Sequence, residues 1–213
     1  MTELTIAIAK GRLRAEALDL LRSTGLSFSP ETLSSRRLAV EDESGRYRLI
    51  FVKPADVPVY VEHGIADCGI VGRDVLLESD ADLLQPLSLN IGACRIVVAA
   101  RNDAPLSRFG MLRVATKYPR IAGQHFGAQG VAVDLIVLSG SVELAPVLGL
   151  ADCVVDLVET GRTLQENGLR IIEVITESTA RLVVNRASYQ LKSEVVGRFL
   201  RSLDDNSAKE NDR

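Results

Sequence analysis

The sequence predicts an α/β protein of two lobes, each built around a mainly parallel sheet. Short apolar segments typical of buried strands alternate with segments of helical periodicity, and turn residues separate them. The alternation forms one complete pattern before Asn90 and a second one after it. We therefore expect a first lobe of residues 1–90 and 180–213, a second lobe of residues 91–179, and a central cleft between the two.

The first lobe should contain three strands and at least three helices. Apolar runs predict the strands Leu4–Ala9, Tyr47–Val52 and Cys68–Val71. Helical spacing predicts a helix from Leu13 to about Arg22, and a second helix opens at Asp56 and is closed by Gly64. The chain should cross to the second lobe near residues 88–97 and return near 172–184. The last helix, Lys192–Leu203, should then pack on the first lobe.

The second lobe repeats the alternation after a loop at Asn102–Gly110. Its predicted strands are Ile96–Ala100, Arg113–Ala115, Val133–Leu138 and Val154–Val158. Its predicted helices are Ile121–Gln129, a helix capped by Ser141 that runs to Leu148, and a short helix that Gly168 ends.

Composition excludes several classes of protein. The net charge of −3 argues against a protein that mainly binds a nucleic-acid backbone, so an anionic substrate would need a local basic site. We find no signal segment and no apolar run long enough to span a bilayer. The three cysteines, Cys68, Cys94 and Cys153, lie in apolar segments without metal-site spacing, which indicates buried thiols. A cytosolic location fits these observations.

The segment Val154–Leu164 carries the strongest local signal. An apolar strand brings Asp156 and Glu159 to its end, and a turn of small and hydroxyl residues then leads into a helix. Gly161 lets the backbone approach an anion, and the first N–H groups of a helix are unpaired donors. The acids suit ribose hydroxyls or a magnesium-bound diphosphate. A plain helix cap at Thr160 is the alternative interpretation.

Two further turns join a strand to a helix. The turn Ser139–Glu143 has a cap residue and an acid in the first helical turn, and it fits either a ligand site or a capped helix. The turn Lys10–Arg12 places two cations before a helix, where the helix dipole disfavours them. A diphosphate would explain these cations, since arginine offers a bidentate fork and lysine a point charge. Projection into water is the alternative.

Other candidates carry weaker signals. Arg36 lies in a polar stretch that alone reads as a solvated loop. Tyr118 follows a strand and suits stacking on a purine or half-buried packing. His63 and His125 lack metal or triad spacing, and we take both as structural. The chain contains no P-loop, no dinucleotide-binding glycine motif and no nucleophile elbow.

Several motifs in order resemble the ATP phosphoribosyltransferase family of histidine biosynthesis, in its short form. They extend over nearly the whole chain, from Ile6 to about Ser202, and are Ala9–Leu13, Asp56–Pro58, Gly64–Gly72, Ala115–Pro119, Gly140–Glu143, Gly149–Asp152 and Glu159–Leu164. The resemblance implies a two-lobed fold similar to periplasmic binding proteins. It also implies a reaction in which adenine N1 of ATP attacks the anomeric carbon of phosphoribosyl pyrophosphate (PRPP), and pyrophosphate leaves.

The resemblance also implies roles for particular residues. The PRPP-binding residues would be Glu143, Asp156, Glu159, Thr160, Gly161, Arg162, Thr163 and Leu164, with the last six holding the 5-phosphate. Lys10, Arg12 and Arg36 would be catalytic: Lys10 and Arg12 would face the leaving pyrophosphate, and Arg36 the phosphate chains near the reacting centre. Asp67, Gly72, Lys117 and Tyr118 would line the ATP side. Mg²⁺ would arrive on the PRPP diphosphate, without protein ligands of its own.

The family resemblance further implies partners. Longer members carry a C-terminal domain that binds histidine, and this sequence ends in a polar tail without one. Short members work with a regulatory subunit similar to histidyl-tRNA synthetase, so we expect a homodimer within a hetero-oligomer.

Two other functions compete with this interpretation. A binding module of the same architecture would capture one small anion, and would not need Lys10 and Arg12 for a leaving group. A phosphoribosyltransferase for a free base or orotate usually has two adjacent acids before the Thr-Gly turn, whereas Asp156 and Glu159 are separated by two apolar residues.

Overall fold

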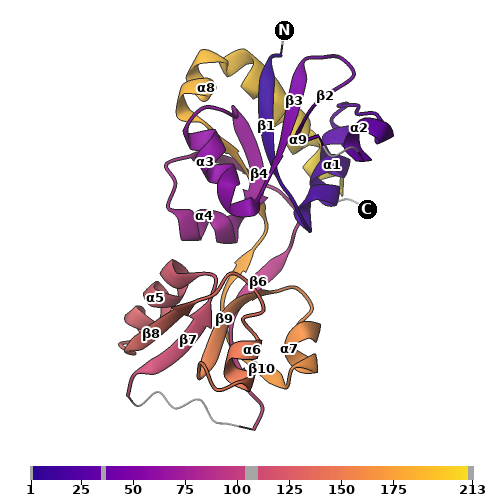
Figure 1. Cartoon of the computed structure of the whole chain (residues 1–213). Coiled ribbons are helices and arrows are strands. Elements are labelled where there is room, and N and C mark those ends of the chain that lie inside the picture. Colours follow the sequence, from indigo (N-terminus) through magenta and orange to yellow (C-terminus); the bar gives the residue numbers. More distant parts are fainter. Residues whose placement is uncertain (1, 35–36, 104–109, 211–213) are drawn as a thin grey trace. The chain divides into compact units, whose positions relative to one another are not determined.

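The computed structural model describes residues 2–34, 37–103 and 110–210 and divides the chain into two compact units (Figure 1). The first unit is Met1–Gly92 with Thr179–Arg213, and the second is Ala93–Ser178. The chain therefore passes between the units twice, at Gly92–Ala93 and at Ser178–Thr179. No helix in the described ranges is long and apolar enough to cross a membrane.

The first unit is built on a six-stranded sheet in the order β2-β3-β1-β4-β11-β5. Its strands are β1 (Leu4–Ala9), β2 (Ala39–Glu41), β3 (Tyr47–Val52), β4 (Cys68–Gly72), β5 (Leu84–Ser88) and β11 (Ala180–Val184). Strand β1 is central and pairs in parallel with β3 and β4. Its side chains from Ile6 to Ala9 are buried, as expected of a strand with both faces covered.

Helices pack against this sheet. They are α1 (Leu13–Ser23), α2 (Pro30–Ser34), α3 (Val57–Glu62) after a 3₁₀ turn at Pro54–Asp56, α4 (Arg73–Ser79), α8 (Arg186–Leu191) and α9 (Ser193–Glu210). Gly69 of β4 allows α3 to pack closely, because a Cβ there would lie 2.8 Å from Val57 and 3.0 Å from Val61. Helix α9 lies beside α1, as Figure 1 shows, and Phe199 and Leu203 of α9 are buried in the core of the unit.

The second unit is built on a five-stranded sheet in the order β10-β6-β9-β7-β8. Its strands are β6 (Cys94–Arg101), β7 (Leu112–Thr116), β8 (Val133–Val137), β9 (Cys153–Val158) and β10 (Leu169–Ser178). Its helices are α5 (Pro119–Ala128), α6 (Leu144–Val147) and α7 (Arg162–Glu166).

The second sheet has a separate apolar cluster on each face. Alternate residues of β9 enter different clusters: Cys153 and Val155 pack with Phe126 of α5, whereas Val154 and Val158 pack with Leu164 of α7. We call these the α5 face and the α7 face of the sheet. Helix α6 also covers the α7 face, through Ala145.

The sheets are mixed, although mainly parallel sheets were expected. The parallel pairs β1–β3, β1–β4, β7–β8 and β7–β9 are flanked by antiparallel pairs that include β4–β11 and β6–β9. The antiparallel pair β6–β10 follows from the two chain crossings, because β6 carries the chain into the second unit and β10 carries it back.

One helix start was predicted wrongly. The helix expected to be capped by Ser141 begins at Leu144 instead, with Glu143 at its N-cap position. Ser141 has φ +48°, which is a left-handed conformation, whereas an N-cap residue normally has an extended backbone. The strands Leu4–Ala9 and Tyr47–Val52 have the predicted bounds.

Candidate functional site

The parallel strands of the second unit end at one edge of their sheet, and each is followed by a polar turn. The register pairs Thr116, the last residue of β7, with Val155 of β9 and with Val137, the last residue of β8. The turns that follow these strands begin at Lys117, Leu138 and Glu159. Ligands of α/β proteins collect at such carboxyl ends, so three of the predicted motifs meet at a suitable place.

Asp156 is the most unusual residue at this edge. Its side chain is 15% exposed, and its buried Oδ1 has no hydrogen-bond partner. The Nζ of Lys117 lies 3.5 Å from Oδ1, which makes an ion pair but leaves the hydrogen-bonding capacity of the oxygen unused. Burial raises the pKa of Asp156; the charge of Lys117 opposes this shift, and the charge of Glu143 adds to it.

The turn Glu159–Gly161 carries exposed donors beside this carboxylate. Gly161 has φ +83°, a conformation that an L-residue rarely adopts, and occupies the N-cap position of α7. Thr160 and Thr163 are exposed, and Leu164 is buried beneath the turn at 5% exposure. Arg162 points into solvent and forms an ion pair with Glu166 at 2.7 Å. The turn therefore offers backbone N–H groups and hydroxyls over an apolar base.

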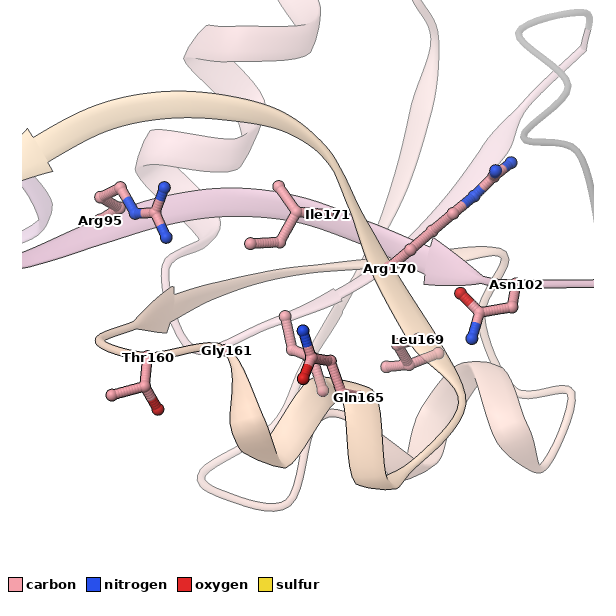
Figure 2. Close-up of a pocket in the computed structure, with 9 residues that line it drawn as sticks. Arg95, Asn102, Thr160, Gly161, Gln165, Leu169, Arg170 and Ile171 are labelled. Atoms are coloured by element: carbon pink, nitrogen blue, oxygen red, sulfur yellow. The ribbon is translucent and has the colours of Figure 1, made fainter.

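A cavity of about 430 Å³ lies between this turn, α7 and the strands β6 and β10 (Figure 2). Polar lining comes from Arg95, Asn102, Thr160 and Gln165, and apolar lining from Leu164, Leu169 and Ile171; Gly161 and Arg170 complete it. Figure 2 shows Arg95, Thr160 and Gly161 toward one end and Asn102 toward the other. Arg95 was not predicted as a site residue, because a single charge inside an apolar strand was its only signal.

The first unit carries a group of cations at the corresponding edge of its own sheet. Lys10 follows β1, and its N–H donates to the carbonyl of Val52 at the end of β3. Arg12 occupies the N-cap position of α1 and donates through Nη2 to the carbonyl of Gly92 at 3.1 Å. Lys53 and Arg73 follow β3 and β4 and were not singled out from the sequence, although each directly follows a strand end. Arg36 lies outside the described residues.

Gly72 also lies at this edge, at the end of β4. A Cβ on Gly72 would collide with the carboxylate of Asp74, which is buried at 6% exposure. This contact requires a residue without a side chain at position 72.

Asp67 lies at the opposite end of β4 and holds elements together. Its carboxylate is 6% exposed and accepts hydrogen bonds from the Thr5 N–H, the Ser188 hydroxyl and the Lys192 ammonium at 2.7–2.8 Å. These bonds connect β1, β4, α8 and the start of α9. The structure thus gives Asp67 a structural role, apart from Gly72 and Lys10, and we do not retain it in the proposed ATP site.

Lys117 and Tyr118 are adjacent in sequence but point to different surroundings. Lys117 reaches Asp156, whose neighbours Val154 and Val158 belong to the α7 face. Tyr118 is half-buried against the cluster of the α5 face, and its N–H donates to the Thr116 hydroxyl at 2.8 Å. The packing interpretation of Tyr118 therefore fits its position better than stacking on a purine.

Side chains that could act as nucleophiles or hold a metal are not grouped at this edge. All three cysteines are buried and none forms a disulfide, and burial raises the pKa of the Cys153 thiol to about 12. Among the residues that the structure describes, no group of three or more His, Cys, Asp and Glu side chains could hold a metal ion. The chemistry available here is hydrogen bonding and charge.

The fold and the site define a class of protein: an α/β fold of two units that carries an exposed Thr-Gly turn beside a buried carboxylate. The fold is that of periplasmic binding proteins, because the aliphatic sulphonate binding protein SsuA of Escherichia coli superposes with a TM-score of 0.62 over 96% of this chain and 72% of that one, at 13% identity. This likeness concerns the fold alone.

Sequence comparison then gives the family. The family model for ATP phosphoribosyltransferase matches residues 53–205, and the ATP phosphoribosyltransferase of Sorangium cellulosum is 50% identical over 91% of this chain and 90% of its own length. A solved ATP phosphoribosyl transferase (HisG:HisZ) complex from Thermotoga maritima matches with a TM-score of 0.83 at 39% identity, covering 95% of this chain and 97% of that chain. The chain belongs to the ATP phosphoribosyltransferase family.

Proposed function

We propose that this protein transfers the 5-phosphoribosyl group of PRPP to N1 of the adenine of ATP and releases pyrophosphate, as the first step of histidine biosynthesis. The observation that carries the proposal is the buried Oδ1 of Asp156, which has an ion-pair partner but accepts no hydrogen bond, beside an exposed Thr-Gly turn. A carboxylate oxygen left without a donor is costly, and the ribose hydroxyls of PRPP are donors that would satisfy it.

The second unit would hold the phosphoribosyl part of the substrate. The N–H groups and hydroxyls of Glu159–Leu164 would bind the 5-phosphate, and Asp156 with Glu143 would accept from the ribose hydroxyls. Lys117 would keep Asp156 ionised against the effect of burial, since its charge lowers the pKa of that carboxyl. The turn and the carboxylate together recognise a phosphorylated sugar, where a turn alone would bind any small anion.

Cations of the first unit would stabilise the leaving group. As N1 attacks, the bond from the anomeric carbon to the pyrophosphate oxygen breaks, pyrophosphate departs with the electron pair, and the alkylated adenine gives up a proton. Such a reaction needs positioning and charge stabilisation more than a strong base. We propose this role for Lys10 and Arg12, and also for Arg36. Gly72 and Lys117 remain candidates for the ATP side.

Magnesium would enter on the diphosphate of PRPP. Mg²⁺ prefers oxygen ligands and usually binds through substrate phosphates and one or two carboxylates. Because no three acidic side chains of the described residues form a metal site, the diphosphate oxygens would hold this cation, without protein ligands of its own. When bound, it would neutralise charge on the departing pyrophosphate.

We also propose that the chain works as a homodimer within a hetero-oligomer. The solved complex from Thermotoga maritima contains two kinds of chain, HisG and HisZ. A regulatory subunit similar to histidyl-tRNA synthetase would be the partner here. Exposed apolar side chains in the first unit, including Val59, Tyr60, Ile65 and Leu191, offer surface for subunit contacts.

Pyrophosphate release tests the proposed reaction and its rivals together. The chain, alone and with its partner subunit, would be supplied with PRPP and Mg²⁺ and then with ATP, adenine or orotate. Release only with ATP supports the proposal. Release with adenine or orotate would indicate a free-base transferase, and PRPP binding without turnover in the complete complex would indicate a binding module.

A further inference from the structure

Arg95 lies near the start of β6, beside the end of β9. The register pairs it with Val158, the last residue of β9, and with Glu177 of β10. Val97 and Ala99, two and four residues along the strand, belong to the cluster of the α7 face. Because side chains alternate along a strand, Arg95 projects from that face as well, toward α7 and the turn before it.

The guanidinium of Arg95 has no counter-charge in the described part of the chain. The residue is half-buried, and neither a hydrogen bond nor an ion pair of its side chain occurs there, even with its cross-strand neighbour Glu177. By contrast Arg101, which lies on the same strand and whose side chain leaves the same face, forms an ion pair with Asp103. Partial burial of a cation costs hydration free energy, and here no protein anion offsets this cost. A bound anionic ligand would offset it.

The cavity beside Arg95 could hold such an anion. Arg95, Thr160 and Gly161 all line it and lie toward the same end in Figure 2. Gly161 has φ +83° at this turn, and Leu164, Leu169 and Ile171 form an apolar wall of the cavity. A guanidinium next to such a turn can bind a phosphate, because its planar fork donates to two phosphate oxygens at once.

We propose that Arg95 is a further PRPP-binding residue, and that its guanidinium contacts the 5-phosphate held by the Thr160–Gly161 turn. This inference rests on the proposed function and adds a residue to it. Arg95 would distinguish a phosphorylated sugar from an unphosphorylated one. Its contribution should appear in the affinity for the phosphoribosyl part, and the ATP part should not depend on it.

The test compares Arg95→Gln and Arg95→Lys with the unaltered chain in the complete complex. Arg95→Gln should raise the KM for PRPP and the Kd for ribose 5-phosphate by roughly 10- to 100-fold, the range expected for one charge-assisted hydrogen bond. The KM for ATP should stay within about twofold, as should the weak affinity for unphosphorylated ribose. Arg95→Lys keeps the charge but loses the planar fork. Its KM for PRPP and its Kd for ribose 5-phosphate should therefore lie between those of Arg95→Gln and of the unaltered chain.

Arg101→Gln is the matched control, because it removes a cation from the same strand that already has a partner. It should leave both the KM for PRPP and the Kd for ribose 5-phosphate unchanged. Unchanged constants in Arg95→Gln, with the control behaving as stated, would overturn the inference and leave the proposed function intact. If the unaltered complex binds neither PRPP nor ribose 5-phosphate, the proposed function itself fails.

Discussion

The ammonium of Lys117 lies 3.5 Å from Oδ1 of Asp156, an oxygen that is buried and accepts no hydrogen bond. The two residues come from neighbouring strands, β7 and β9, whose carboxyl ends the parallel register brings together. The two residues therefore form an ion pair without a hydrogen bond to Oδ1, at the edge of the sheet where the polar turns meet. Under the proposed function, a ribose hydroxyl would donate to this oxygen without displacing an existing hydrogen bond.

Asp156→Asn should bind PRPP less tightly while folding at least as well. The neutral amide cannot accept from ribose hydroxyls as strongly as a carboxylate, so the KM for PRPP should rise about tenfold or more. The same change removes a poorly paired buried charge, which should keep or raise the midpoint of thermal unfolding at pH 7. Steady-state kinetics and calorimetry on one preparation measure both effects.

The stability difference between Asp156→Asn and the unaltered chain should depend on pH. Burial raises the pKa of Asp156 in the folded state above its unfolded value, so the folded chain binds the proton more tightly than the unfolded chain. The carboxyl therefore favours folding most below its unfolded pKa, and this contribution is lost as pH rises through the folded pKa. The advantage of Asn should shrink as the solution is acidified. An advantage that grows on acidification would contradict the assignment.

Gly161→Ala should weaken PRPP binding beyond any loss of stability. A Cβ at position 161 meets only ordinary contacts, at 3.7 Å from Val158, so the cost of about 1 kcal/mol comes from φ +83°. Gly130→Ala is a matched control, with φ +69°, open space for the Cβ and a position at the end of α5. Both variants should lose similar unfolding free energy in denaturant titrations. Only Gly161→Ala should raise the KM for PRPP, and an equal effect in both would argue against the turn as a phosphate site.

Arg12→Ala should lower turnover by about 10²- to 10³-fold, the loss expected when one group that stabilises developing charge is removed. Arg22→Ala is the control, because Arg22 lies in the same helix and pairs with the exposed Asp19. It should have little effect on turnover. Because Arg12 also bonds Gly92, thermal unfolding of both variants must be measured beside the kinetics. A near-normal rate in Arg12→Ala would remove this residue from the mechanism.

Asp67→Ala separates a structural role from a ligand role. Loss of this carboxylate leaves Lys192, Ser188 and the Thr5 N–H without their acceptor, which should cost about 2–4 kcal/mol of unfolding free energy. Denaturant titration measures that cost. A large rise in the KM for ATP with unfolding free energy unchanged would return Asp67 to the ATP site.

Strand cores and their following turns were predictable from the sequence. Leu4–Ala9 is a continuous apolar run that ends before a glycine turn, and few other structures fit such a pattern. Strand β10 was expected only as a return crossing, because it is an edge strand with Glu173 and Glu177 along it and register shifts in its pairing. An edge strand is only partly buried, so its sequence lacks the regular pattern of apolar residues that marks a buried strand.

The direction of individual side chains was less predictable than the position of the motifs. The turn at 159–164 and Asp156 lie close together because they belong to β9 and the turn that follows it, and the parallel register of β7 and β9 adds Lys117. Tyr118 and Asp67 depend on which way a side chain leaves its strand end, and the pattern of neighbouring residues does not specify this. Arg95 was overlooked because a single charge in an apolar strand has no signature of its own.

Direct identification of the product tests the central claim most directly. The complete complex would be incubated with ATP, PRPP, Mg²⁺ and pyrophosphatase, and the nucleotide analysed by mass spectrometry and by ¹⁵N NMR of labelled adenine. We predict phosphoribosyl-ATP with the new bond at N1, formed only when both substrates are present and strongly reduced in Asp156→Asn. Absence of this product from the complete complex, or its unchanged formation in Asp156→Asn, would contradict the account.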